Sequence, residues 1–410
     1  MSLLLSFSDI LKDLERRQEK KVLDKIPSLQ GIKVPTELAL EQCSSEATAL
    51  HKASLAVRFA EGDTRKTGIR VADLTGGLGV DCWAFSRHSD AVYYNEMNPD
   101  LAKVAEENFA AMGISGVEFH NETVEAGNDR WKASLAGFRP DIIYLDPARR
   151  DGAGKKVFLL EECSPNVLEL MPDLLSISPK LMIKLSPMAD ISLIVKRLSE
   201  RCLAASGSFG IRSVHVVGFD GECKELLCLV DRDWRGPCDI VTEELSRQSS
   251  YTGTLGDKAS VRIAGNLLPG EFFLIPTASA MKSGCHEQIC AEAGIAKLDR
   301  FTNIYKAGEA EIGQLGPNRG FFRIYAVEEI LPLSNASIKD LGGRYPEADV
   351  SARNIPMTSE ELQARLAGGK SRRNAESSSQ AVQIIGFSTP HGRFLARLSP
   401  LPDKQTSSNI

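Results

Sequence analysis

Long hydrophobic runs are missing from this sequence of 410 residues. No stretch approaches the roughly 20 apolar residues that a helix needs to cross a bilayer. The first residues, MSLLLSFSDILKDLERR, contain no basic start and no cleavage site of small residues, so they do not resemble a secretory signal. These absences predict a cytoplasmic protein that has no membrane segment.

Paired cysteines are absent as well. The nine cysteines are scattered, odd in number and include no CxxC pair, which indicates reduced thiols rather than a disulfide framework. Cys285, His286 and Cys290 lie close together in the sequence, but a zinc site needs a second set of ligands at similar spacing, and none follows. The sequence therefore predicts no bound metal.

The chain has no excess of positive charge, since 49 Lys and Arg stand against 54 Asp and Glu. Residues 334–410 hold 10 basic and 7 acidic residues, a net charge of +3, and the remainder holds 39 and 47, a net charge of −8. A strong nucleic-acid binder usually carries a pronounced basic surface. Composition alone therefore leaves RNA binding undecided.

Two common nucleotide-binding patterns are missing from the glycine-rich segment VADLTGGLGVD at residues 71–81. A dinucleotide fingerprint would need a third small residue where Cys82 stands, and a phosphate-binding P-loop would close with Lys-Ser or Lys-Thr. The sequence therefore disfavours both a nicotinamide cofactor and a nucleoside triphosphate bound by a P-loop.

The same segment has the features of another kind of cofactor-binding turn. Asp73 ends an apolar strand. Gly76, Gly77 and Gly79 let the backbone bend tightly and approach a ligand, and the first amides of the next helix point into the same crevice. Twenty-three residues after Asp73, the strand AVYYNE ends in Glu96, where a carboxylate can hold a ribose diol. We therefore predict a site for a nucleotide-type cofactor.

Strands alternate with helices around this turn. Short apolar strands, each followed by a helical pattern, are expected at 69–73, 91–96, 117–121, 141–146 and 180–185. Such alternation is typical of a parallel sheet covered by helices on both faces. The segments SVHVVGFD and ELLCLVDRD, with Gly221 between them, add an antiparallel hairpin. The sequence therefore predicts an α/β fold with a seven-stranded Rossmann-like sheet.

The fourth strand leads into DPARR at residues 146–150. Asp146 is expected at the carboxyl end of this strand, where open α/β sheets bind their ligands, and its carboxylate can accept a hydrogen bond or a proton from a nucleophilic nitrogen. Pro147 is expected to fix the following turn, and Arg149 and Arg150 to meet a phosphate or stack on a base. The alternative is an Asp that caps a helix, followed by solvated arginines.

The acid followed by x-x-G-x-G and the acid that ends strand two resemble the first two motifs of class I S-adenosylmethionine-dependent methyltransferases. The resemblance extends from residue 41 to about residue 230 and implies S-adenosyl-L-methionine as the cofactor. The residues it assigns to cofactor binding are Asp73, Thr75, Gly76, Gly77, Gly79, Glu96 and Glu122. The turn would contact the methionine carboxylate, and Asp73 would contact the ammonium group directly or through water. Glu96 would hold the ribose, and Glu122 or Thr123 the adenine. The segment 41–53 looks like the helix that covers the amino-acid end of the cofactor in RNA-modifying methyltransferases.

The strand-four motif looks like the Asp-Pro-Pro-aromatic motif of amino methyltransferases, with Ala148 and Arg149 replacing the second proline and the aromatic residue. It is also similar to the motif of uridine C5-methyltransferases, which use a cysteine at the end of strand five. Ser186 stands at that place here, and a serine hydroxyl is a far weaker nucleophile at neutral pH. Methylation of nitrogen is therefore favoured. Lys184, in strand five, is a further candidate for the acceptor pocket.

Four parts are expected along the chain. They are a helical N-terminal region at 1–66, a class I methyltransferase domain at 67–233, a linker with a small ferredoxin-like α+β unit at 234–333, and a further unit at 334–401. The chain looks most like bacterial methyltransferases with a THUMP-like C-terminal domain, which implies that the last part binds RNA, either tRNA or rRNA. We therefore predict an enzyme that methylates an amino or ring nitrogen of an RNA base. A protein or small-molecule methyltransferase and a non-catalytic, cofactor-gated RNA-binding protein are the alternatives.

Overall fold

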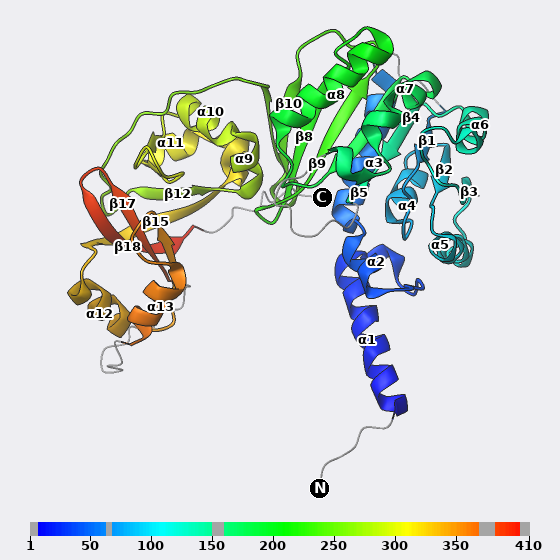
Figure 1. The fold of residues 1–410 in the computed structure, drawn as a ribbon. Helices are drawn as coiled ribbons and strands as arrows, with labels where there is room; N and C mark the ends of the chain where they lie inside the picture. Colours follow the sequence, from blue (N-terminus) through cyan, green and yellow to red (C-terminus); the bar gives the residue numbers. More distant parts are fainter. Residues whose placement is uncertain (1–6, 63–67, 150–159, 369–381, 402–410) are drawn as a thin grey trace. The chain divides into compact units, whose positions relative to one another are not determined.

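A computed structural model describes residues 7–62, 68–149, 160–368 and 382–401 of the chain (Figure 1). The chain divides into two compact units, Met1–Val217 with Glu225–Ile240, and Gly218–Lys224 with Val241–Ile410. The described residues include no helix with the length and apolar character needed to span a membrane. The described residues form two large β-sheets, one of nine strands and one of seven.

The sheet of the first unit has the predicted α/β topology. Its strands, in order across the sheet, are β8 (Ile211–Phe219), β9 (Glu222–Asp231), β7 (Lys180–Leu185), β4 (Ile142–Leu145), β1 (Arg70–Asp73), β2 (Ala91–Asn95) and β3 (Val117–His120). Neighbouring strands from β7 to β3 pair in parallel, and β9 is antiparallel to β7. The predicted Rossmann-like sheet, with its parallel strands and its antiparallel hairpin, is confirmed, but the hairpin does not form the edge of the sheet.

Two additional strands, β10 (Asp239–Glu244) and β11 (Ser249–Thr254), continue the strand order beyond β8. The predicted linker therefore begins with two strands. Their sequence is polar, but β10 alternates between half-buried and buried positions, which is the period of a strand with one covered face. Alternation over six residues was too short a signal to separate this strand from a polar connection.

Helix α5 (Pro99–Ala111) shows how local sequence sets the bounds of these elements. The side chain of Asn98 caps the helix by accepting hydrogen bonds from two backbone amides of the first turn, at 3.0 and 3.3 Å. Pro99 follows at a position where its missing N–H costs nothing. Ala105 and Phe109 lie on the buried face of the helix, as the helical period predicts.

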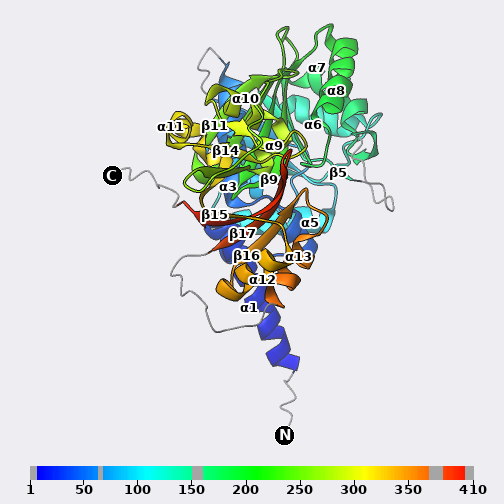
Figure 2. The same ribbon diagram turned by 90° about the vertical axis from the view of Figure 1, so that its left-hand side faces the viewer.

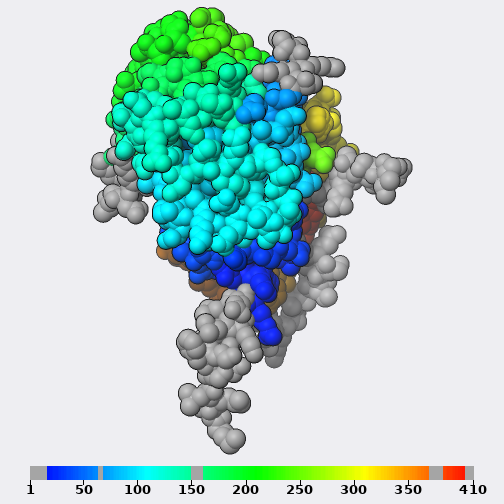
Figure 3. All heavy atoms as spheres, turned by 90° about the vertical axis from the view of Figure 1, so that its right-hand side faces the viewer, coloured from blue at the N-terminus to red at the C-terminus, as the bar shows by residue number. Residues whose placement is uncertain are grey.

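The helices of the first unit pack in two groups. On one side α3 (Glu46–Glu61) packs against α4 (Val80–Ser86), and on the other α7 (Val167–Ile177) packs against both α6 (Asp129–Phe138) and α8 (Ile191–Ser206). β4 is buried at all its positions, as expected of a strand whose two faces are both covered. Figure 3 shows the face of this unit on which α5 and α6 lie, coloured cyan. The N-terminal region consists of α1 (Phe7–Lys25), η1 (Pro27–Leu29) and α2 (Glu37–Gln42).

The second unit contains a seven-stranded, largely antiparallel sheet. In order across it, the strands are β13 (Ala296–Lys297), β14 (Tyr305–Ala307), β12 (Phe272–Pro276), β15 (Phe322–Pro332), β18 (Gly392–Pro400), β17 (Gln383–Thr389) and β16 (Asp349–Arg353). The long strand β15 pairs with β12 on one edge and with β18 on the other. Strands of the predicted parts 234–333 and 334–401 therefore lie side by side in one sheet, because each satisfies the backbone hydrogen bonds of the other.

Helices cover parts of this sheet. They are α9 (Ala278–Ser283), α10 (Cys285–Glu292), α11 (Glu309–Gln314), α12 (Asn335–Arg344) and α13 (Ser359–Ala367), with the short η5 (Gly316–Phe321). The short η4 (Leu245–Arg247) connects β10 to β11. Figure 2 shows α12 and α13 side by side, and both helices share a core with β17 and β18. The side chains of Thr358 and Glu361 form a capping box at the start of α13. Cys285, His286 and Cys290 are buried in α10.

Candidate active site

A cavity of about 1000 Å³ lies in the first unit. Its lining comes from the carboxyl ends of the neighbouring strands β1, β2, β4 and β7 and from the loops that follow them, where open α/β sheets bind ligands. The predicted site residues in this lining are Thr75, Gly76, Gly77, Glu96, Glu122 and Asp146. Of the segment 41–53, Gln42, Cys43 and Ser44 form part of the wall, at the end of α2 and in the loop that follows it.

The glycine turn is fixed by close packing against two aromatic rings. A Cβ atom on Gly76 would lie 2.2 Å from the ring of Tyr94, and a Cβ atom on Gly79 would lie 2.8 Å from the ring of Phe109. Gly79 also has a φ of 87°, which favours glycine. The hydroxyl of Tyr94 donates a hydrogen bond of 2.7 Å to the carbonyl of Gly77. A side chain is thereby excluded at Gly76 and Gly79, and Gly76 and Gly77 line the cavity.

Asp73 lies beneath this turn and does not line the cavity. It is 1% exposed. Its Oδ1 atom accepts hydrogen bonds from the amide and the hydroxyl of Thr75, at 2.9 and 3.2 Å, and its Oδ2 atom accepts one from the thiol of Cys82 at 3.2 Å. Burial, followed by repulsion from the Asp81 carboxylate, raises the pKa of Asp73 to about 7. In this structure Asp73 therefore holds the turn in place from below.

Glu96 joins the turn to the start of α5. Its Oε2 atom accepts a hydrogen bond from the amide of Gly77 at 3.0 Å, and its Oε1 atom accepts one from the amide of Asn98 at 2.8 Å. Each carboxylate oxygen keeps further acceptor capacity. Glu96 is thus a preoriented carboxylate at the edge of the cavity, as the sequence predicts.

The segment after β3 is held by Asn95, a residue that sequence reasoning missed. The side chain of Asn95 accepts a hydrogen bond from the amide of Glu122 at 2.9 Å and donates to its carbonyl at 3.0 Å. A second donation, of 3.3 Å, reaches the carbonyl of Leu74. The carboxylate of Glu122 pairs with Arg130 at 2.9 Å. An amide at the end of a predicted strand, next to Glu96, was the signal in the sequence.

Asp146 and Lys184, which both line the cavity, form an ion pair. The Oδ2 atom of Asp146 lies 2.5 Å from the Nζ atom of Lys184, and the backbone amide of Asp146 donates a hydrogen bond of 2.7 Å to the hydroxyl of Thr75. Burial by itself lowers the pKa of Lys184, but the carboxylates of Asp146, Glu225 and Asp81 together raise it above its usual value. Lys184 therefore stays charged, and it holds Asp146 in a fixed position at the end of β4.

The residues after Asp146 continue as a short strand rather than as the predicted turn. Pro147 is buried and does not line the cavity. β5 (Ala148–Arg149) pairs with β6 (Cys163–Ser164), which is followed closely by α7. The partner strand lies too far along the chain for local sequence to predict this pairing. The side chain of Arg149 and the whole of Arg150 fall outside the described residues.

A buried lysine connects the N-terminal helices to this site. Lys52, in α3, is fully buried, and its Nζ atom lies 2.9 Å from a carboxylate oxygen of Glu225 and 3.3 Å from Oδ1 of Asp81. It also donates a hydrogen bond of 2.8 Å to the hydroxyl of Ser44. Sequence reasoning missed Lys52 because a lysine on an amphipathic helix is usually solvated. Its position one helical turn from the apolar Ala49 and Ala56 was the available signal.

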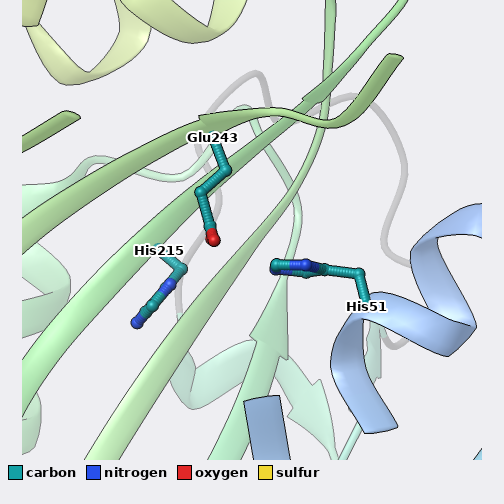
Figure 4. Close-up of side chains that lie close together, drawn as sticks. All are labelled: His51, His215 and Glu243. Atoms are coloured by element: carbon teal, nitrogen blue, oxygen red, sulfur yellow. The ribbon is translucent and has the colours of Figure 1, made fainter. Parts of the chain in front are cut away.

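Three other side chains with metal-ligand chemistry are drawn in Figure 4: His51 on α3, His215 on β8 and Glu243 on β10. His51 and His215 belong to the first unit and Glu243 to the second. Zinc sites in proteins have at least three protein ligands. The described residues of the first unit supply two in this group, and we assign no metal to it.

No family model matches the chain, and neither does any curated protein. Among solved structures, the chain is similar to a "putative methyltransferase" from Porphyromonas gingivalis W83, with a TM-score of 0.73 and 25% identity over 94% of this chain and 89% of the other. A 16S rRNA N2 G1207 methyltransferase of T. thermophilus, in complex with AdoMet and guanosine, has a TM-score of 0.31 and 13% identity over 46% and 43% of the two chains. The ribosomal protein L11 methylase of Lactobacillus delbrueckii subsp. bulgaricus has a TM-score of 0.30 and 18% identity over 44% and 79%.

The likeness to the Porphyromonas gingivalis protein extends over nearly all of this chain. It shows that the chain has the fold of a protein described as a methyltransferase, and it agrees with the Rossmann-like sheet of the first unit. The other two TM-scores are too low to support a conclusion about the substrate.

Proposed function

We propose that this protein is an S-adenosyl-L-methionine-dependent methyltransferase that methylates an amino or ring nitrogen of an RNA base. The observation that carries the proposal is the arrangement of the cavity at the carboxyl edge of the sheet. The glycine turn and Glu96 line one part of this cavity, and the ion pair of Asp146 with Lys184 lines another part. The first part, the cofactor side, is suited to a nucleoside cofactor, and the second part, the acceptor side, is suited to a nitrogen acceptor.

The cofactor side fits S-adenosyl-L-methionine in chemistry. Thr75, Gly76 and Gly77 offer a backbone surface without bulky side chains for the methionine part, and Glu96 offers a carboxylate for the ribose hydroxyls. Glu122 and Thr123 line the same cavity and would meet the adenine. Asp73 supports the turn from beneath, which replaces the direct contact that the motif suggests. The bound cofactor would supply the electrophilic methyl group.

The acceptor side positions the nucleophile. Among the described residues, Lys184 binds the Oδ2 atom of Asp146, and the Oδ1 atom is the one proposed to accept a hydrogen bond from an N–H group of the substrate. Methyl transfer from a sulfonium needs little covalent assistance, so alignment of nitrogen, methyl carbon and sulfur supplies most of the rate. The fixed position of Asp146 serves that alignment.

The second unit is proposed to bind RNA, with residues 334–401 as its THUMP-like part. Exposed arginines at strand ends, Arg353 on β16 and Arg393 on β18, offer contacts for phosphates. Because β18 pairs with β15 along most of its length, removal of residues 334–410 would disrupt the sheet. Single substitutions of arginines are therefore a better test of RNA binding than a truncation.

Transfer of a labelled methyl group tests the proposed reaction. The intact protein is incubated with labelled S-adenosyl-L-methionine and, in turn, with tRNA, rRNA, protein and metabolite fractions from cells that lack it. We expect label in one RNA fraction, and nucleoside mass spectrometry then identifies the methylated base. Label in protein or metabolites would favour those substrates, and cofactor binding without any transfer would favour a cofactor-gated RNA-binding protein.

Replacing Glu96 by alanine should weaken the binding of S-adenosyl-L-methionine about 10- to 100-fold. Loss of a charged hydrogen-bond partner costs about 1.5 to 3 kcal/mol, and a factor of ten corresponds to about 1.4 kcal/mol. Calorimetry measures the effect. Glu118→Ala is the matched control, since Glu118 is exposed on β3 and does not line the cavity. Equal affinities of the Glu96 variant and the control would contradict the placement of the cofactor.

A further inference from the structure

We propose that Asp81, rather than Asp73, binds the ammonium group of the cofactor's methionine part. This inference rests on the proposed use of S-adenosyl-L-methionine and names a residue that the sequence motif does not single out. Asp81 lies in the first turn of α4, directly after the glycine turn, and lines the cavity.

Asp73 is poorly placed for this contact. The residue is 1% exposed and does not line the cavity, and its carboxylate faces Thr75 and Cys82 beneath the turn. With a pKa of about 7, it is partly protonated near neutral pH. A protonated carboxyl group attracts a cation much less than a carboxylate does.

Asp81 has the features that Asp73 lacks. Its Oδ2 atom accepts hydrogen bonds from the hydroxyls of Ser44, at 3.0 Å, and Tyr144, at 2.9 Å. Its Oδ1 atom is buried and accepts no hydrogen bond from the described residues, although the Nζ atom of Lys52 lies 3.3 Å away. Burial by itself raises the pKa of Asp81, but Lys52 and Lys184 outweigh it and lower the pKa. Asp81 is therefore an anion with an acceptor atom to spare.

The charges around Asp81 favour a cation as the ligand. The single ammonium of Lys52 faces two carboxylates, because it pairs with Glu225 at 2.9 Å as well as with Asp81. Lys184 forms its own pair with Asp146. The group of Lys52, Asp81 and Glu225 thus has one negative charge in excess, and an unbalanced buried charge is costly. An ammonium group in the cavity next to Asp81 would balance it.

Ser44 links the Asp81 carboxylate to the wall of the cavity. Its hydroxyl accepts a hydrogen bond from Lys52 and donates one to Asp81, and its residue lines the cavity in the loop between α2 and α3. The N-terminal helices thereby hold the Asp81 carboxylate in position. This gives a physical reason for the cover that these helices provide over the amino-acid end of the cofactor.

The test compares two ligands that differ by the amino group alone. S-adenosylhomocysteine and its analogue without the α-amino group are titrated by calorimetry into the wild type, Asp81→Asn and Asp73→Asn. We expect the wild type to bind the analogue about 10- to 100-fold more weakly. Asp81→Asn should bind S-adenosylhomocysteine more weakly by a similar factor and should no longer distinguish the two ligands. Asp73→Asn, the matched control, should still distinguish them.

The assignment would be overturned if Asp81→Asn still distinguished the two ligands as the wild type does, or if Asp73→Asn no longer distinguished them. Either result would leave the proposed cofactor unchanged. Failure of the wild type to bind S-adenosylhomocysteine at all would instead overturn the proposed function, and this inference with it. If Asp81→Asn does not fold, Asp81→Glu replaces it, because the charge is kept and displaced by one methylene group. That variant should lose part of the discrimination, and unchanged discrimination would again contradict the role of Asp81.

Discussion

Replacing Asp146 by alanine should slow methyl transfer by about 10²- to 10⁴-fold, the usual range for loss of a group that handles a proton of the nucleophile. The affinity for S-adenosyl-L-methionine should stay within a few-fold, because Asp146 faces the acceptor side of the cavity. Single-turnover transfer of a labelled methyl group measures the rate, and calorimetry measures the affinity.

Asp173→Ala is the control for this experiment. Asp173 and Asp146 have the same side-chain exposure, 34%, and each pairs with a lysine, Asp173 with Lys132 at 2.7 Å and Asp146 with Lys184 at 2.5 Å. Asp173 does not line the cavity, so its loss should leave both rate and affinity unchanged. If Asp146→Ala lowered the transfer rate and the cofactor affinity in parallel, Asp146 would be a cofactor-binding residue instead. If the variant kept full activity, the DPARR segment would have a structural role only.

Replacing Lys52 by alanine should lower the free energy of unfolding of the first unit by about 3 to 5 kcal/mol, the usual cost of breaking a buried ion pair by removing one partner. The variant would leave the carboxylates of Glu225 and Asp81 buried without their cation. Urea unfolding followed by tryptophan fluorescence reports on this unit, because all three tryptophans of the chain, Trp83, Trp131 and Trp234, belong to it.

Lys21→Ala separates the effect of burial from the loss of a positive charge. Lys21 forms an ion pair with Glu37, and the two side chains are 52% and 65% exposed. Exposed ion pairs contribute about 0 to 1 kcal/mol, so this variant should unfold at nearly the wild-type urea concentration. If Lys52→Ala lowered the free energy of unfolding by an equally small amount, water or rearrangement would be compensating the buried carboxylates of Asp81 and Glu225. The charge argument made for Asp81 would then fail.

Much of the first unit could be predicted from the sequence. The five parallel strands and the hairpin around Gly221 lie where apolar runs and turn residues place them. Asn98 and Pro99 start α5, and in the second unit Thr358 and Glu361 form a capping box at the start of α13. These features are local, because a cap, a turn or a short strand depends on residues within a few positions of each other.

The second unit was harder to predict. Apolar strands were expected there, but no local pattern states which strands pair. The register of β15 with β18 joins residues 325–332 to residues 394–400, and so unites two parts that composition separates. The strands β5 and β10 were missed for a related reason, since a two-residue strand and a polar strand are defined by their partners more than by their own residues.

The sequence by itself determined that an acid and a glycine turn follow the first strand, that a second acid ends the next strand, and that Asp146 ends the fourth. Only the tertiary structure decided what each acid does. Asp73 is covered by Thr75 and Cys82, whereas Asp81 meets Tyr144 and a lysine that pairs with Glu225, 173 residues away from it in the chain. Whether a carboxylate is buried, paired or open to a cavity depends on which distant side chains surround it, and those neighbours are set by packing rather than by spacing along the chain.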